Sequence, residues 1–345
     1  MRVVKGLLIL AIVLGLAAAG VAWVAYTRVH EPFQGFEGPE QFVDIPPGTG
    51  AGGVGARLAE AGVVRDANTF RVALWLTGRA RDLKAGEYRF DRASSAVEVI
   101  DRIARGDVYK RLVTFREGLI IADIAAVFEE RGFGPAAEFE RAAKNRALIA
   151  DLDPDARDLE GYLFPETYAL PRGTTADELV AQMVGLFRKL YSEGLQAEAA
   201  AAGLTTRQVV TLASLVEKET ARAEERPLVA AVYRNRLAIG MGMQADPTVI
   251  YALRLAGRYD GNLSRADLQF DSPYNTYRYA GLPPGPIASP GLASIEAAIR
   301  PADVRHLYFV SRNDGSHVFA DTLAEHNRNV HEWQVRYFRE RRRSR

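Results

Sequence analysis

Hydrophobic and polar positions divide the chain into one leading apolar run and a longer part with periodic patterns. Residues 6–27 carry no charge and are mostly Leu, Ile, Val and Ala. A helix of this length is long enough to cross a hydrocarbon core of about 30 Å. Arg2 and Lys5 precede the run, and Trp23 and Tyr26 lie where an interfacial aromatic belt belongs. The pattern predicts a transmembrane helix over 6–27, with residues 1–5 in the cytoplasm and the rest of the chain exported.

A cleaved signal peptide is the competing interpretation of the same segment. Basic residues precede the apolar run, and Ala17, Ala18 and Ala19 offer small side chains to a peptidase. The run continues beyond these alanines for longer than a signal peptide needs, which favours an uncleaved anchor. Residues 28–40 are rich in Pro and Gly and aperiodic, so we expect a short tether there.

The exported part contains an internal repeat. The segment FVDIPPGTGAGGVGARLAEAGVV from Phe42 aligns with LVTFREGLIIADIAAVFEERGF from Leu112, and Gly48 matches Gly118 at an offset of 70. Each segment predicts a strand, a Gly turn and an amphipathic helix that ends at a second Gly. A further pairing joins KAGEYRF from Lys84 with LEGYLFPETY from Leu159, both of which we expect to be strands, each followed by another amphipathic helix. We infer a duplication rather than chance similarity between two βα units.

This order of elements resembles a LysM-type module, a fold that binds the GlcNAc-containing glycans of cell walls. The expected boundaries are 41–109 for a LysM-like domain and 110–175 for a second βα unit that joins the catalytic domain. Because shape alone is a weak argument for binding, function has to be argued from a site.

Long helices dominate residues 176–335, where we place a catalytic domain. Thr205 and Gln208 form a capping-box pattern that opens the helix VVTLASLVEKETARAEER. Its apolar stripe runs through Val209, Leu212 and Val216, and the next position on that face is Glu219. A carboxyl group that continues a buried stripe is desolvated, which raises its pKa towards the range of a general acid. Glu219 is therefore the candidate catalytic residue.

The neighbouring charges leave a simpler interpretation open. Lys218, Arg222, Glu224 and other charged residues follow the stripe, so this end of the helix is also compatible with a solvated surface. Glu217 lies two residues from Glu219 and points to another side of the helix, which makes a catalytic pair of the two unfavourable.

Two later segments supply candidate supporting residues. Asp246 and Pro247 are typical of a helix start, with Asp246 as the expected N-cap, whereas Gln244 just before them has no such structural role. The segment SPYNTYRYAGLPPGPIASPG from Ser272 is a rigid Pro- and Tyr-rich loop around Asn275, Thr276 and Tyr277, suited to holding groups in a sugar-binding cleft. We expect Ser289 and Pro290 to cap the helix that follows this loop. After that helix, NDG at 313–315 predicts a β-hairpin, and a last helix begins near residue 323.

Composition narrows the function classes. The 345 residues have a net charge of +1, and the Arg-rich tail 336–345 holds six Arg against one Glu, which leaves the rest of the chain near −4. This balance gives no indication of nucleic-acid binding. The chain has no cysteine, which excludes disulfides, thiolate zinc sites and an N-terminal lipidated Cys. No nucleotide-binding motif, nucleophile elbow or metal-binding frame is present, so we expect neither a cofactor nor a metal.

Five motifs in order resemble one known family. They are LASLVEKET from Leu212, QADPTVIYAL from Gln244, LSRADL from Leu263, SPYNTYRYAGLPPGPIASPG from Ser272 and YFVSRNDGSHVFADTLAEHNRNV from Tyr308. The series is similar to that of the YceG-like endolytic murein transglycosylases. In that family the second Glu of the E-K-E-T motif is catalytic, and it corresponds to Glu219. Residues 134–158 match the family only loosely, and the Arg-rich tail lies outside its pattern.

The resemblance implies cleavage of the MurNAc–GlcNAc β-1,4 bond of peptidoglycan without water, which leaves 1,6-anhydroMurNAc ends. One acid suffices for this reaction, whereas ordinary glycosidases use two carboxylates.

The expected roles are catalytic for Glu219 and substrate-binding or supporting for Glu217, Gln244, Asp246, Asn275, Thr276 and Tyr277. The implied partners are glycan strands and peptidoglycan synthases at the cytoplasmic (inner) membrane, with the bulk of the chain in the periplasm or outside. The alternative is a non-catalytic LysM-type anchor or scaffold bound to the wall. The expected fold class is α+β: a transmembrane helix, a LysM-like domain and a mainly helical catalytic domain with a hairpin.

Overall fold

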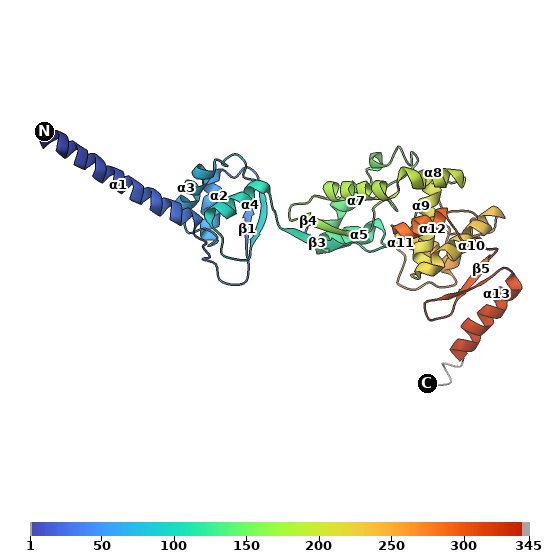
Figure 1. Ribbon diagram of the computed structural model, residues 1–345. Coiled ribbons are helices and arrows are strands. Elements are labelled where there is room, and N and C mark those ends of the chain that lie inside the picture. Colours follow the sequence, from blue (N-terminus) through green and yellow to red (C-terminus); the bar gives the residue numbers. More distant parts are fainter. Residues whose placement is uncertain (1, 340–345) are drawn as a thin grey trace. The chain divides into compact units, whose positions relative to one another are not determined.

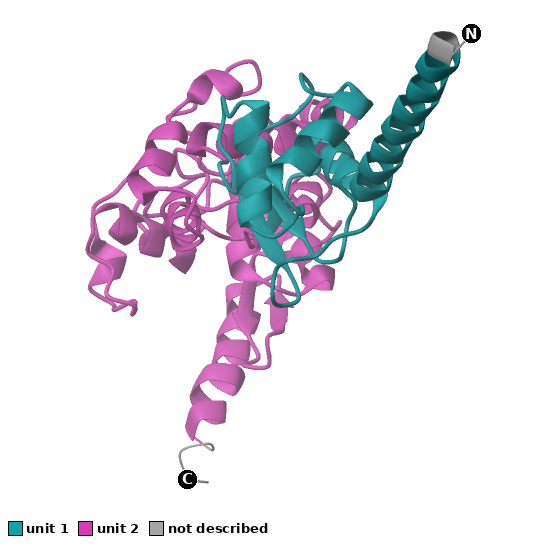
Figure 2. Cartoon of the chain, turned by 90° about the vertical axis from the view of Figure 1, so that its left-hand side faces the viewer, with its two compact units in different colours: residues 1–112, 169–173 teal, residues 113–168, 174–345 magenta. Residues whose placement is uncertain are grey.

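A computed structural model describes residues 2–339, so residue 1 and most of the Arg-rich tail lie outside the described part (Figure 1). The chain divides into two compact units, coloured separately in Figure 2. Unit 1 comprises residues 1–112 and 169–173, and unit 2 comprises 113–168 and 174–345. Residues 169–173 thus belong to unit 1 although they follow residues of unit 2 in the sequence. The expected boundaries did not include such a segment, because each expected domain was one continuous range.

In unit 1 the leading helix α1 (Arg2–His30) is followed along the chain by elements that form a small α+β core. Its elements are β1 (Gln41–Ile45), α2 (Ala51–Glu60), α3 (Ala67–Thr77), β2 (Gly86–Phe90) and α4 (Ala96–Arg105). β1 and β2 pair antiparallel, with Val43 opposite Tyr88. Alternate residues of the strands and the apolar stripes of the helices meet in one core, in which Tyr88, Phe90 and Phe70 are almost completely buried.

The apolar run forms one continuous helix that extends past its expected end at residue 27. Large apolar side chains from Leu7 to Tyr26 are more than half exposed, whereas Val29 is 1% exposed inside the core of unit 1. The expected tether over 28–40 is also packed: Phe33 exchanges two backbone hydrogen bonds with Ser94, and Gly35 donates to the Gly62 carbonyl at 2.8 Å. The expected short tether is thus attached to unit 1 at these points, because an aperiodic segment can still be held by backbone hydrogen bonds.

The second repeat has the same element order as the first. It consists of β3 (Lys110–Thr114), α5 (Ile121–Glu130), α6 (Ala136–Ala142), the 3-10 turn η1 (Arg146–Leu148), β4 (Thr167–Pro171) and α7 (Ala176–Leu190), with β3 and β4 in one two-stranded sheet. Helices α2 and α5 begin and end at an offset of 70. The matched glycines Gly48 and Gly118, and Gly62 and Gly132, all have φ between 69° and 80°, where a Cβ would be strained. These matches support the inferred duplication.

The second pairing of the repeat is only partly correct. LEGYLFPETY was expected to be a strand from residue 159, but Gly161 lies in a turn with φ of 83° and β4 begins at Thr167. The side chains of Tyr162, Leu163 and Phe164 are buried nonetheless. A short apolar run is therefore buried here without being a strand, and its sequence pattern alone does not distinguish the two.

The remainder of unit 2 is mainly helical, as expected. It contains α8 (Glu193–Ala201), α9 (Thr206–Glu219), the 3-10 turn η2 (Ala223–Glu225), α10 (Arg226–Ala238), α11 (Asp246–Leu255), the 3-10 turn η3 (Asp267–Gln269), α12 (Leu292–Ile299), the antiparallel hairpin β5 (Tyr308–Ser311) and β6 (His317–Ala320), α13 (Leu323–Val330) and the π-helix η4 (His331–Arg336). The α+β class and the hairpin are confirmed; the likeness of unit 1 to LysM stays a prediction.

Candidate active site

Helix α9 carries the candidate acid at its last residue. Thr205 and Gln208 form the predicted capping box, and Val209, Leu212 and Val216 are completely buried against neighbouring helices such as α10 and α12. Glu219 continues this stripe to the end of the helix, where it is partly exposed. The periodicity therefore placed Glu219 correctly, at the edge of the core of unit 2.

The carboxyl group of Glu219 lies among groups that set its protonation. Burial and the nearby charge of Asp246 raise the pKa of Glu219 to about 7, while a hydrogen bond from Tyr233 and the charge of Arg236 act in the opposite direction. The Tyr233 hydroxyl donates to Oε2 of Glu219 at 3.3 Å, and Tyr233 itself is 1% exposed. An acid with this pKa is protonated in part near neutral pH, as a general acid requires.

Arg236 fixes the segment that follows α10. Its buried guanidinium donates to the Leu307 carbonyl at 2.7 Å, at the edge of the hairpin, and to the Met243 and Gly242 carbonyls just before α11. One side chain thus holds two loops beside Glu219. These charge-assisted bonds satisfy carbonyls that would otherwise be buried without a donor.

Asp246 and Tyr277 form a polar pair near the carboxyl group of Glu219. The Tyr277 hydroxyl donates to Oδ1 of Asp246 at 2.6 Å, and Tyr277 is 36% exposed. The expected N-cap role of Asp246 is wrong, because Ala245 occupies that position and Asp246 is the first residue of α11. Gln244 is exposed and has φ of 49°, a conformation that non-glycine residues rarely adopt and that is often found at functional sites.

Asn275 and Thr276 are buried and shape the loop instead of facing solvent. The Asn275 amide donates to the Leu268 and Phe270 carbonyls, and its oxygen accepts from the backbone N–H of Tyr277 at 3.0 Å. Thr276 Oγ1 accepts from the Ala245 N–H and pairs with the Thr248 hydroxyl at 2.9 Å. Both residues therefore support Tyr277 and the start of α11.

Glu217 points away from Glu219, as the helical spacing predicts. Its Oε2 accepts from the Gly291 N–H and the Ser294 hydroxyl at the start of α12, and its other oxygen pairs with Arg226 at 3.6 Å. The expected cap of α12 by Ser289 and Pro290 is wrong, because Gly291 occupies the N-cap position. The carboxylate of Glu217 lies at this end of α12, where a negative charge is favourable.

A cavity of about 550 Å3 lies beside Glu217 and contains a residue that the sequence analysis missed. Glu117 lines this cavity, and burial together with the charge of Glu217 raises the pKa of Glu117. Both carboxylates lie near Arg226. The sequence offered one signal for Glu117, its place directly before the matched Gly118 of the repeat.

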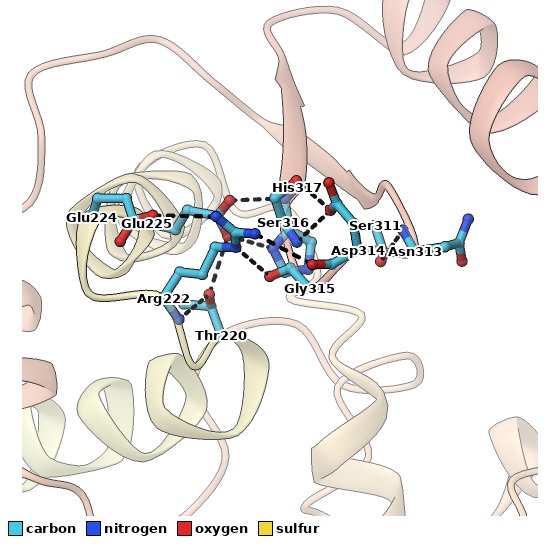
Figure 3. Close-up of polar contacts among 10 residues, drawn as sticks. All are labelled: Thr220, Arg222, Glu224, Glu225, Ser311, Asn313, Asp314, Gly315, Ser316 and His317. Carbon is cyan, nitrogen blue, oxygen red and sulfur yellow. Dashed lines mark hydrogen bonds and ion pairs between the residues drawn. The ribbon is translucent and has the colours of Figure 1, made fainter.

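The hairpin β5–β6 is fastened to the segment directly after Glu219 (Figure 3). The buried carboxylate of Glu225 accepts from the His317 backbone N–H at 2.8 Å, lies 2.7 Å from Nδ1 of His317 and accepts from the Thr220 hydroxyl at 3.1 Å. Arg222 donates to the Gly315 and Asp314 carbonyls at the hairpin turn. Since Thr220 follows Glu219, this network fixes the end of α9 against the hairpin.

Glu225→Leu is expected to release the hairpin, because several buried polar groups lose their partner at a cost of about 1–3 kcal/mol each. Hydrogen exchange is expected to become at least about tenfold faster in residues 308–320, and mass spectrometry of the exchanged protein checks this. The matched control is Glu193→Leu, the same substitution at an exposed position on α8. Unchanged exchange in Glu225→Leu would contradict the role given to Glu225.

Tyr233 and Arg236 were also missed by the sequence analysis. They lie three residues apart on one face of α10, and both are buried. A Tyr and an Arg at this spacing are common on exposed helices, so the pattern holds no signal that marks them. Only the packing of α10 against α9 places them at Glu219.

Comparison with known proteins identifies the family of this chain. The model of the YceG-like family matches residues 43–332. The chain is 31% identical to the endolytic murein transglycosylase of Bacillus subtilis (83% of this chain, 82% of the relative) and 33% identical to that of Streptococcus pneumoniae strain R6 (84% and 58%). The chain thus spans little more than half of the pneumococcal relative. A crystal structure of a yceG-like protein from Listeria monocytogenes superposes with a TM-score of 0.58 at 28% identity, covering 84% of this chain and 98% of that one. This chain belongs to the YceG-like family.

Proposed function

We propose that this protein is an endolytic transglycosylase that cleaves peptidoglycan at the MurNAc–GlcNAc β-1,4 bond and forms 1,6-anhydroMurNAc ends, with Glu219 as its single acid and base. The observation that carries the proposal is the position of Glu219: it ends a buried stripe, has a pKa raised to about 7 and lies beside Tyr233 and Asp246. The curated relatives named endolytic murein transglycosylases support the reaction class.

The reaction balances with one carboxyl group. Protonated Glu219 donates its proton to the glycosidic oxygen as the bond from that oxygen to C1 of MurNAc breaks, and the electron pair stays on the oxygen. The carboxylate then takes the proton of the MurNAc C6 hydroxyl as its oxygen attacks C1 and closes the anhydro ring. Glu217 takes no part as a second acid, because its carboxylate is engaged at the start of α12.

The remaining candidates divide into contacts and supports. The exposed side chains of Gln244, Asp246 and Tyr277 are proposed to bind the sugar and the developing oxocarbenium ion. Asn275 and Thr276 are proposed as positioning residues, because their polar atoms are already used inside the loop. A non-catalytic wall anchor would have no need for an acid with a raised pKa at the end of a buried stripe.

The proposed reaction is tested by the products of the wild-type protein. Isolated peptidoglycan incubated with the full chain is expected to release fragments that end in 1,6-anhydroMurNAc, each lighter by one water than the hydrolysis product, as measured by mass spectrometry. Reducing ends in place of anhydro ends would identify a hydrolase. Retained binding to peptidoglycan without any release would instead favour the wall anchor.

We also propose that α1 anchors the protein in the cytoplasmic membrane, with the rest of the chain outside the cytoplasm, where peptidoglycan synthases are candidate partners. An 18-residue apolar window within Lys5–His30 has a mean hydropathy of 2.7, and none of it is buried. A signal sequence near the N-terminus has the same features. Burial of Val29, at the end of the same helix, in the core of unit 1 supports retention of the helix.

A further inference from the structure

Helix α3 of unit 1 has apolar residues on its exposed side as well as on its buried side. Phe70, Ala73 and Leu74 pack in the core, each at most 5% exposed. On the opposite side Val72, Trp75 and Leu76 are 38%, 80% and 48% exposed, at the spacings of three and four that share one helix face. Three large apolar side chains on the outer face of a short helix are unusual for a surface that faces water.

Two other helices show that the fold does not require this face to be apolar. Helix α4 of the same unit has a charged outer side, with Glu98, Asp101 and Arg105. In the second repeat, α6 and the turn after it match α3 when the buried Phe139 and Ala142 are aligned with Phe70 and Ala73, an offset of 69. At that offset, the positions of the exposed apolar residues are filled by Arg141, Lys144 and Asn145, which are exposed.

The position of α3 indicates what covers this face. Asp66, the N-cap of α3, pairs with Arg28 of α1 at 3.1 Å. Val72 lines a cavity of about 300 Å3 together with Ala25 and Val29. Helix α3 therefore lies beside the last two turns of α1, as Figure 1 also shows. Those turns include Tyr26, at the expected level of the membrane interface, where Trp side chains are favoured.

We propose that the exposed face of α3, formed by Val72, Trp75 and Leu76, inserts into the membrane interface beside α1 and gives unit 1 a second contact with the lipid. The proposal rests on the membrane anchoring proposed for α1. Burial of this apolar face in the interface stabilises the contact in proportion to its area. Val29 packs in the core of unit 1 and so attaches the end of α1 to that core. The membrane contacts of α1 and of α3 therefore fix the orientation of unit 1 at the membrane.

The absence of cysteine allows a direct test, since single cysteines can be labelled uniquely. Trp75→Cys and, as control, Asp44→Cys on β1 are made in the full chain and labelled with an environment-sensitive fluorophore. Both positions are exposed, and β1 lies on the side of unit 1 away from α1 in Figure 1. The labelled proteins are placed in nanodiscs of phosphatidylethanolamine and phosphatidylglycerol, with or without nitroxide-labelled lipid.

We expect the label at position 75 to shift its emission to shorter wavelength and to lose intensity when nitroxide lipid is present, and the label at position 44 to do neither. Equal, water-like emission at both positions would overturn the contact of α3, even with the protein in the disc. Failure of the protein to elute with the discs would instead refute the anchor. Release of peptidoglycan fragments by the same samples reports on catalysis independently of both.

Discussion

Glu219→Gln is expected to lower the rate of peptidoglycan cleavage by about 10³-fold while the protein remains folded, because the amide can neither donate the proton to the glycosidic oxygen nor accept one from the C6 hydroxyl. The substitution keeps the shape of the side chain, and the Tyr233 hydroxyl can still donate to its oxygen. Anhydro-ended fragments counted by mass spectrometry over time measure the loss.

Two controls separate loss of chemistry from loss of structure. Glu193→Gln makes the same change at an exposed position on α8 and is expected to leave the rate unchanged.

The second control is the pH dependence of the unfolding temperature. Burial raises the pKa of Glu219 from 4.5 to about 7, so the folded state holds this proton more tightly than the unfolded state, and stability is lost as pH rises through that range. The Gln variant lacks this loss, so its unfolding temperature is expected to exceed that of the wild type at pH 8 but not at pH 4. Undiminished anhydro product from Glu219→Gln would remove Glu219 from the reaction.

Opposite shifts of the pH profile are expected from the two groups that tune Glu219. Because Glu219 has to be protonated to act, kcat/KM is expected to fall as pH rises above about 7. The charge of Asp246 raises the pKa of Glu219, so Asp246→Asn is expected to move this fall to lower pH. The hydrogen bond from Tyr233 lowers the same pKa, so Tyr233→Phe is expected to move the fall to higher pH.

Each shift is expected to be about half a unit to one unit, which at pH 8 corresponds to a change of up to about tenfold in the protonated fraction. The midpoint of the profile is the decisive measurement, since both substitutions can also lower the maximal rate. Profiles of fragment release between pH 5 and about pH 9 provide it. Shifts in the same direction for both variants would contradict Glu219 as the group that titrates.

The predictions that held were those based on local physics. The strands near Phe42 and Leu112, the capping box at Thr205 and the hairpin at residues 313–315 all depend on neighbours in the sequence, and the structure has each of them. Contacts between distant segments were not predicted. Gly35 of the tether donates to the Gly62 carbonyl, and Glu217 accepts from the N–H of Gly291, more than 70 residues away.

The candidate site shows the same division. The stripe through Val209, Leu212 and Val216 is a property of the sequence, and it alone placed Glu219 at the boundary of a buried face. The sequence did not predict which residues surround Glu219, because Tyr233 and Arg236 become its neighbours only when α10 packs on α9. Likewise Asn275 looked like a substrate contact until the fold showed its amide in use within the loop.

By itself, then, the sequence determined the apolar leading helix, the repeated units, the mainly helical second half and the one carboxylate on a buried stripe, since each follows from periodicity or turn chemistry within a few residues. Tertiary structure decided the surroundings that raise the pKa of that carboxylate, the use of the Asn275 amide within its loop, and the place of α3 beside α1. Burial and electrostatic interaction depend on distances between segments far apart in the chain, and only the folded chain sets those distances.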